Sequence, residues 1–186
     1  MMLPKIVDNL IILEVERIEN QSITNLAQNM PKMTVQDSEQ GAAGFGLFNN
    51  TGQAIGPGHV LALLSSGKKY AAQPIRSNCP EHGASGSVQL KCGHFQIYPK
   101  TAPDGRHGYM GGAANEDKRA QNNAVIVEID CKTSDNKHST ATVIISSTEI
   151  HSAAEVLVYY GEDPEGQWTH RSHSSPPGGG GTGGST

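Results

Sequence analysis

Apolar residues follow two different periods along the chain, and the change between them falls near residue 33. Upstream, they recur every three or four positions, as on one face of an α-helix, at Val7, Leu10, Ile11, Val15 and Ile18. This spacing predicts helix within residues 3–29, and Asn20 followed by Pro31 predicts one helix and then a second, short one. Alternate residues of LIILEV (residues 10–15) are also apolar, which leaves a strand open at that point.

Downstream, the chain changes to short runs of β-branched and aliphatic residues, which predict strands. These runs are KMTVQD (32–37), GFGLFNN (44–50), HVLALL (59–64), AVIVEID (124–130) and ATVIISS (141–147). The connections between them, such as SNCPEHGASGS (77–87) and KTAPDGRHG (100–108), are rich in turn formers. A further strand is predicted to end at Tyr159, Tyr160 and Gly161 after a turn that contains Glu155. The sequence therefore predicts a mainly β domain of several small sheets behind an N-terminal helical segment.

Composition limits where the chain acts and what it binds. The net charge is −4 and no run of Lys or Arg occurs, which argues against direct nucleic-acid binding. No stretch is apolar for long enough to cross a bilayer, and the apolar start carries acidic residues, unlike a signal peptide. Three cysteines do not form a disulfide framework, so we expect an intracellular location, nuclear or cytoplasmic. Residues 174–186, SSPPGGGGTGGST, are low in complexity and predict a disordered tail.

Four side chains between residues 79 and 94 are of types that bind zinc: Cys79, His82, Cys92 and His94. Their spacing, C-x2-H-x9-C-x-H, is not a familiar zinc pattern, and the C-x-H step is tight. We therefore expect no metal, and interpret these residues as free thiols and loop histidines within a variable insert.

Three other segments hold candidate ligand-binding residues, each with a plain structural alternative. Gly44 and Gly46 flank Phe45, and glycines at this spacing let a backbone approach a ligand or simply form a turn. The pattern is not the dinucleotide fingerprint, because the third glycine and the following helix are missing. Asn115 and Asn123 can bind a ligand amine or carboxylate, or can cap turns. The third segment is EVLVYYG (155–161), at the exit of the last predicted strand.

In order and spacing, these segments resemble the SET-domain protein lysine methyltransferases. The matching positions are Gly44, Gly46, Leu47, Phe48, Ile55, Pro57, Gly58, Gly67, Gly108, Asn115, Asn123, Ala124, Ile150, Glu155, Val156, Tyr160 and Gly161. The resemblance spans residues 33–168. It implies a minimal, stand-alone domain: a helical segment (1–32), a SET-like domain (33–173) with a variable insert (70–107), and the tail (174–186). No cysteine-rich modules flank it.

The chain also departs from the family pattern. Glu116 replaces the usual His, so Asn-Glu stands where the family has Asn-His-Ser, and Gly112 replaces an Arg. The Gly-Glu pair that precedes the family's second glutamate is Ala153 and Ala154.

The resemblance implies a SET (β-clip-like) fold with a C-terminal pseudoknot that brings Asn115 and Tyr160 together. It implies S-adenosylmethionine as cofactor and a lysine-bearing peptide or histone tail as substrate. Tyr160 is then the catalytic hydroxyl. The implied cofactor contacts are Gly44, Phe45, Gly46, Leu47, Tyr109, Asn115, Glu116, Tyr160 and Trp168. The implied substrate contacts are Tyr98, Tyr159 and Trp168. An alternative role for Tyr159 and Trp168 is packing at the edge of the core.

Two other functions remain open from sequence. The departures at Gly112, Glu116 and Ala154 would suit a catalytically inactive SET-like binding module. Alternatively, only the β-clip-like scaffold is shared, as in small sugar-binding or antifreeze-type domains, and the tyrosines are structural. That last reading leaves the family order of Asn115, Asn123, Glu155 and Tyr160 without an explanation. Oligomeric state has no signal in the sequence.

Overall fold

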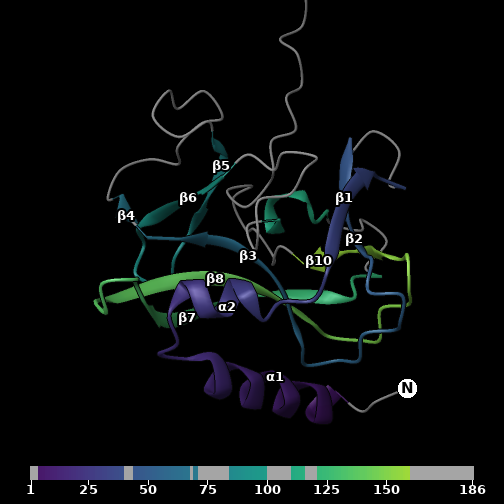
Figure 1. The fold of residues 1–186 in the computed structure, drawn as a ribbon, viewed down its shortest axis with the longest axis horizontal. Coiled ribbons are helices and arrows are strands. Elements are labelled where there is room, and N and C mark those ends of the chain that lie inside the picture. The colour runs from purple at the N-terminus through teal and green to yellow at the C-terminus, as the bar shows by residue number, and fades with distance from the viewer. Residues whose placement is uncertain are drawn as a thin grey trace, which may run out of the picture.

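The computed structural model describes residues 4–39, 44–67, 69–70, 84–99, 110–115 and 121–159. Two helices open the chain, α1 (Pro4–Ile18) and α2 (Ile23–Gln28), as the period of apolar residues predicts (Figure 1). Ser22 caps α2 by accepting a hydrogen bond from the Asn25 amide at 3.1 Å. The strand alternative over residues 10–15 is therefore wrong. Within the described residues, no helix has the length and apolarity that a bilayer crossing requires.

The centre of the molecule is a four-stranded sheet in the order β10-β7-β8-β3. Its strands are β3 (Val60–Ser66), β7 (Ala124–Lys132), β8 (His138–Ser146) and the two-residue β10 (Val158–Tyr159). The long pairings β7–β8 and β8–β3 are antiparallel, whereas β10 joins β7 in parallel. Residues 140–146 of β8 are all buried, because both faces of the sheet are covered.

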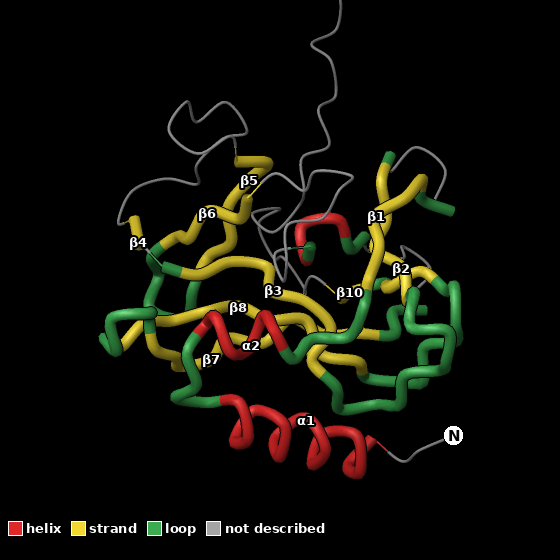
Figure 2. The backbone as a smooth tube through the Cα atoms, viewed as in Figure 1, coloured by secondary structure: helices red, strands yellow, loops and turns green. Residues whose placement is uncertain are grey.

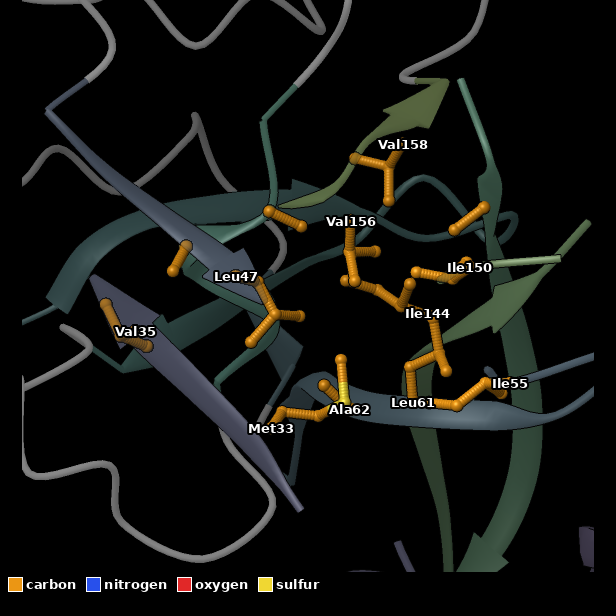
Figure 3. Close-up of a cluster of buried hydrophobic side chains, with 13 residues drawn as sticks. Met33, Val35, Leu47, Ile55, Leu61, Ala62, Ile144, Ile150, Val156 and Val158 are labelled. Carbon is orange, nitrogen blue, oxygen red and sulfur yellow. The ribbon is translucent and has the colours of Figure 1, made fainter. Parts of the chain in front are cut away.

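Successive side chains of β8 point to opposite faces, and each face has its own hydrophobic core. Val143 and Ile145 pack with Ile18 of α1 and Leu26 of α2, so the helices cover one face (Figure 2). Ile144 packs on the other face against side chains of the neighbouring sheet (Figure 3). This second core is the one that lies under the candidate site.

The sheet on that second face is small and has the order β1-β2-β9. It contains β1 (Met33–Asp37), β2 (Phe45–Asn49) and the two-residue β9 (Glu155–Val156). Leu47 and Val156 are register partners across β2 and β9, and both are fully buried (Figure 3). Because the Val156 side chain must point into the core, the orientation of β9 is fixed, and with it the direction of the neighbouring Glu155 side chain.

A third sheet has the order β4-β6-β5, with β4 (Lys69–Tyr70), β5 (Ala84–Gln89) and β6 (Phe95–Pro99). Gln96 ties it to the central sheet: its buried amide donates to the Thr140 carbonyl at 2.9 Å and accepts from the Ser65 hydroxyl at 3.1 Å. The sequence places part of β5 in a connection, and this prediction is wrong. The segment ASGSVQ lacks a β-branched pattern, so its strand state depends on pairing with β6.

The prediction of a mainly β chain with small sheets is confirmed, and β1, β2, β3, β7 and β8 lie where the apolar runs place them. The prediction of a turn at Glu155 is wrong, since Glu155 belongs to β9. The domain boundaries at 32/33 and 173/174 and the limits of the insert stay predictions.

Candidate functional site

The segment from Glu155 to Tyr159 changes sheets, and two asparagines hold it at the crossing. On one side the Val158 amide donates to the Asn115 carbonyl at 2.8 Å. On the other side the Asn123 side chain accepts from the Leu157 amide at 2.8 Å and donates to the Glu155 carbonyl at 2.9 Å. The amides of Asn123 and Ala124 both donate to the Leu157 carbonyl. The backbone that leads toward residue 160 is thus bonded on both sides, next to Asn115.

Glu155 is buried, with 5% of its surface exposed, and its carboxylate accepts three hydrogen bonds from described residues. The Ser38 hydroxyl donates to Oε1 at 2.7 Å and the Asn115 amide donates to the same oxygen at 2.9 Å. The Glu39 backbone amide donates to Oε2 at 3.0 Å. The carboxylate therefore connects the end of β1, the segment at Asn115 and β9.

Gly46 makes room for this carboxylate. A Cβ at residue 46 would lie 2.2 Å from Glu155 Oε1 and 2.9 Å from a ring carbon of Phe48, distances that no side chain tolerates. Gly44 has φ of 77°, in the left-handed region that favours glycine. Glycine is therefore required at the two positions for different reasons. Gly44 adopts a left-handed backbone conformation, and Gly46 leaves space for the Glu155 carboxylate.

The Asn115 amide nitrogen also donates to the Phe45 carbonyl at 2.9 Å and approaches the Ser38 hydroxyl at 3.1 Å. Its Oδ1 has no hydrogen-bond partner among the residues that the structure describes. Phe45 itself is 51% exposed. One amide oxygen, an exposed aromatic ring and two glycines therefore adjoin a buried carboxylate.

The structure brings together the predicted cofactor contacts Gly44, Phe45, Gly46 and Asn115. The Leu47 side chain is instead fully buried in the core, so only its backbone could face a ligand. Tyr98 lies on β6 and Tyr159 on β10. Four predicted residues lie outside the described part of the chain: Tyr109, Glu116, Tyr160 and Trp168.

Of the four side chains considered for zinc, Cys79 and His82 lie outside the described residues. Cys92 and His94 lie in the turn between β5 and β6, where the Leu90 amide donates to the His94 carbonyl at 2.8 Å. Cys92 is exposed and its thiol is free. Among described residues, no three side chains of metal-binding type gather in one place.

Two residues that contact β9 or the segment before it, Ser38 and Asn49, were not identified as site residues from the sequence. Ser38 reaches Glu155 across 117 residues, a contact that no local pattern signals. Asn49 is fully buried, and its amide donates to carbonyls of Gln53, Ile150 and His151. Asn49 thereby fixes the turn that leads into β9.

A cleft of about 350 Å³ lies elsewhere, between the helices and the loop before β3. Its lining includes the polar residues Arg17, Gln21, Gln53 and His59 and the apolar residues Ile18 and Val60. None of the predicted cofactor or substrate residues lines it.

No protein-family model and no curated protein matches the chain. Among solved structures, a Plasmodium falciparum protein named as a candidate histone methyltransferase is similar at 16% identity and a TM-score of 0.46, over 72% of this chain and 96% of that one. The SET domain of the tumor suppressor RIZ1 is similar at 15% identity and a TM-score of 0.43, over 77% and 78% of the two chains.

A third similar structure is the Chaetomium thermophilum Polycomb Repressive Complex 2 in an autoinhibited conformation bound to S-adenosylmethionine. The identity is 13% and the TM-score is 0.42, and the match covers 71% of this chain but only 15% of that much longer one. Each of these three TM-scores lies below 0.5.

Proposed function

We propose that the chain is a SET-type, S-adenosylmethionine-dependent lysine N-methyltransferase that acts on a basic peptide or histone tail. One observation carries the proposal. Gly46, Asn115 and Glu155 match the SET pattern at three separate places in the sequence, and they meet at a single hydrogen-bonded point. A shared scaffold with merely structural tyrosines leaves the family order of Asn115, Asn123, Glu155 and Tyr160 without an explanation.

The residues at this point suit a cofactor that carries positive charge and an amino group. Asn115 Oδ1 has no partner among the described residues, and in this proposal it accepts a hydrogen bond from the amine. A Cβ at Gly44 would meet open space, so the backbone next to Phe45 can approach a ligand closely on that side. In this proposal Leu47, Tyr109, Glu116 and Trp168 complete the cofactor contacts.

S-adenosylmethionine would supply an activated methyl group, and the chain's own residues would position the amine that receives it. A lysine amine has an unperturbed pKa of about 10.4, so it must lose a proton before it can attack. An apolar channel lowers that pKa by desolvation. We assign this channel to Tyr98, Tyr159 and Trp168, and the hydroxyl that orients the amine to Tyr160. Tyr160 follows β10 directly, where pairing with β7 fixes the backbone at Tyr159.

The proposal includes the family's C-terminal pseudoknot. The hydrogen bonds of Val158 to Asn115 and of Leu157 to Asn123 support it, because they place the last strand between two segments that adjoin residues 116–120. It also includes a nuclear or cytoplasmic location, which a histone-type substrate would require.

The test is methyl transfer from labelled S-adenosylmethionine to an array of lysine-containing peptides. We expect the wild-type chain to label a subset of peptides and Tyr160→Phe to lose about a hundredfold in rate, since it deletes one positioned hydroxyl. Tyr70→Phe is the matched control: Tyr70 lies on β4 and has no assigned role in the site, so this variant should retain most of the activity. Equal rates for wild type and Tyr160→Phe would remove Tyr160 from the mechanism.

A second candidate is a catalytically inactive SET-like module that binds a peptide. The sequence departures at Gly112, Glu116 and Ala154 favour it. It predicts that the chain binds lysine peptides from the same array without labelling them, so binding and labelling on one array separate the two functions.

A further inference from the structure

We infer that Glu155 determines the charge preference of this site: its buried carboxylate makes the site bind a cationic sulfonium more tightly than the neutral thioether left after methyl transfer. The inference rests on the proposed function, and it assigns to Glu155 a specificity role beyond shaping the turn.

The first step is that Glu155 is buried and that, within the described part of the chain, no basic side chain forms an ion pair with it. The hydrogen bonds that its carboxylate receives from described residues come from three donors, on Ser38, Glu39 and Asn115. An ionised carboxylate only accepts hydrogen bonds, so these contacts match the charged form. The ion pairs found within the described chain involve other acidic residues, namely Glu14, Asp135 and Glu149. Neutral donors stabilise the carboxylate but leave its net charge in place.

The second step is where this charge lies. Oε1 shares the Asn115 amide with the Phe45 carbonyl, and it lies so close to Gly46 that a Cβ there would be 2.2 Å away. The charge is therefore in direct contact with the turn and the amide to which we assign the cofactor. Interactions between charges are stronger in a partly buried site than in water, because the local dielectric constant is lower.

The third step is what changes during the reaction. The lysine nitrogen forms a bond to the methyl carbon while the carbon–sulfur bond breaks, and the electron pair of that bond stays on sulfur. The positive charge thus moves from the sulfur to the methylated amine, which afterwards releases a proton to solvent. S-adenosylmethionine and S-adenosylhomocysteine otherwise carry the same charged groups, so a fixed negative charge favours the first over the second.

The experiment measures the affinities of both ligands by calorimetry for the wild type, Glu155→Gln and Ser38→Ala. We expect Glu155→Gln to reduce the preference for S-adenosylmethionine over S-adenosylhomocysteine by about tenfold, since the charge is lost. Ser38→Ala is the matched control: it deletes a hydrogen bond to the same oxygen and keeps the charge, so the preference should stay within about twofold.

A wild-type comparison covers the case in which Glu155→Gln does not fold. Sinefungin carries an amine-bearing carbon in place of the sulfonium, and we expect the wild type to bind it several-fold more tightly than S-adenosylhomocysteine near pH 7. Equal affinities for these two ligands, or an unchanged preference in folded Glu155→Gln, would overturn the inference and leave the methyltransferase proposal intact. A wild type that binds none of the ligands would instead overturn the proposed function, and the inference with it.

Discussion

At the scale of single residues, Ala153 shows how a sequence departure can leave a local structure intact. The family pattern has glycine at this position, and Ala153 retains a left-handed backbone with φ of 63°. Its amide donates to the buried Asn49 carbonyl at 2.8 Å, and the Ala154 carbonyl accepts from the Asn49 amide at 3.0 Å. These bonds to β2 keep the turn in place despite the Cβ.

Because an alanine in the left-handed region is strained, we expect Ala153→Gly to raise the free energy of unfolding. The relief of roughly 1–2 kcal/mol exceeds the entropy cost of glycine, which leaves a gain of about 0.5–1 kcal/mol. Ala154→Gly is the control; Ala154 has no left-handed strain to relieve, so this change should destabilise the chain. Urea titration measures both, and a loss of stability in Ala153→Gly would contradict the strain.

The residue scale also separates what sequence could predict at the site from what it could not. Gly46, Asn115 and Glu155 could be found because each stands in a recognisable motif. Ser38 could not, since a serine in the sequence VQDSEQG has no distinguishing pattern and its partner lies 117 residues away. An asparagine such as Asn49 is typical of an exposed turn. Its burial depends on contacts with residues 150 and 151, which lie about 100 positions away in the sequence.

At the scale of elements, the pairing of β2 with β9 is what places the carboxylate at the candidate site. Leu47 faces Val156 and Phe48 faces Glu155 in this register. The long strands β3, β7 and β8 were predictable because their own apolar runs specify them. The strand predicted to run into Tyr159 is confirmed by β10, whereas the two-residue β9 was not predictable, because it exists only through a partner distant in sequence.

We expect Gly46→Ala to disrupt this junction. The new Cβ would lie 2.2 Å from Glu155 Oε1, so the carboxylate must move, at a cost of about 1–3 kcal/mol in unfolding free energy. Gly52→Ala is the control, because its Cβ meets open space and adds only the strain of its φ of 79°. If both variants bind S-adenosylmethionine equally well, the Gly46–Glu155 contact has no part in the site.

At the scale of the whole molecule, the helical segment and the candidate site lie on opposite faces of the central sheet. Ile18 is fully buried among residues of β3, β7 and β8, and a Cβ at Gly58 would lie 2.9 Å from Leu10. The period of apolar residues predicted the helices, but it could not predict which sheet face they cover, because that depends on the fold of the rest of the chain.

This packing makes the helices part of the sheet's core. We expect Ile18→Ala to lower the free energy of unfolding by about 2–5 kcal/mol, as for other buried isoleucines. Ile12→Ala, on the same helix but at a side chain that is 53% exposed, should change it by less than about 0.5 kcal/mol. Similar effects of the two substitutions in chemical denaturation would show that α1 does not share the core.

The measurement that tests the central claim most directly is calorimetric titration of the wild-type chain with S-adenosylmethionine, beside Asn115→Ala and Asn50→Ala. We expect the wild type to bind one equivalent and Asn115→Ala to bind at least about tenfold more weakly, since it loses the amide that joins Phe45 to Glu155. Asn50 is exposed, so Asn50→Ala should bind like the wild type. No binding to the wild type at millimolar cofactor would contradict the account.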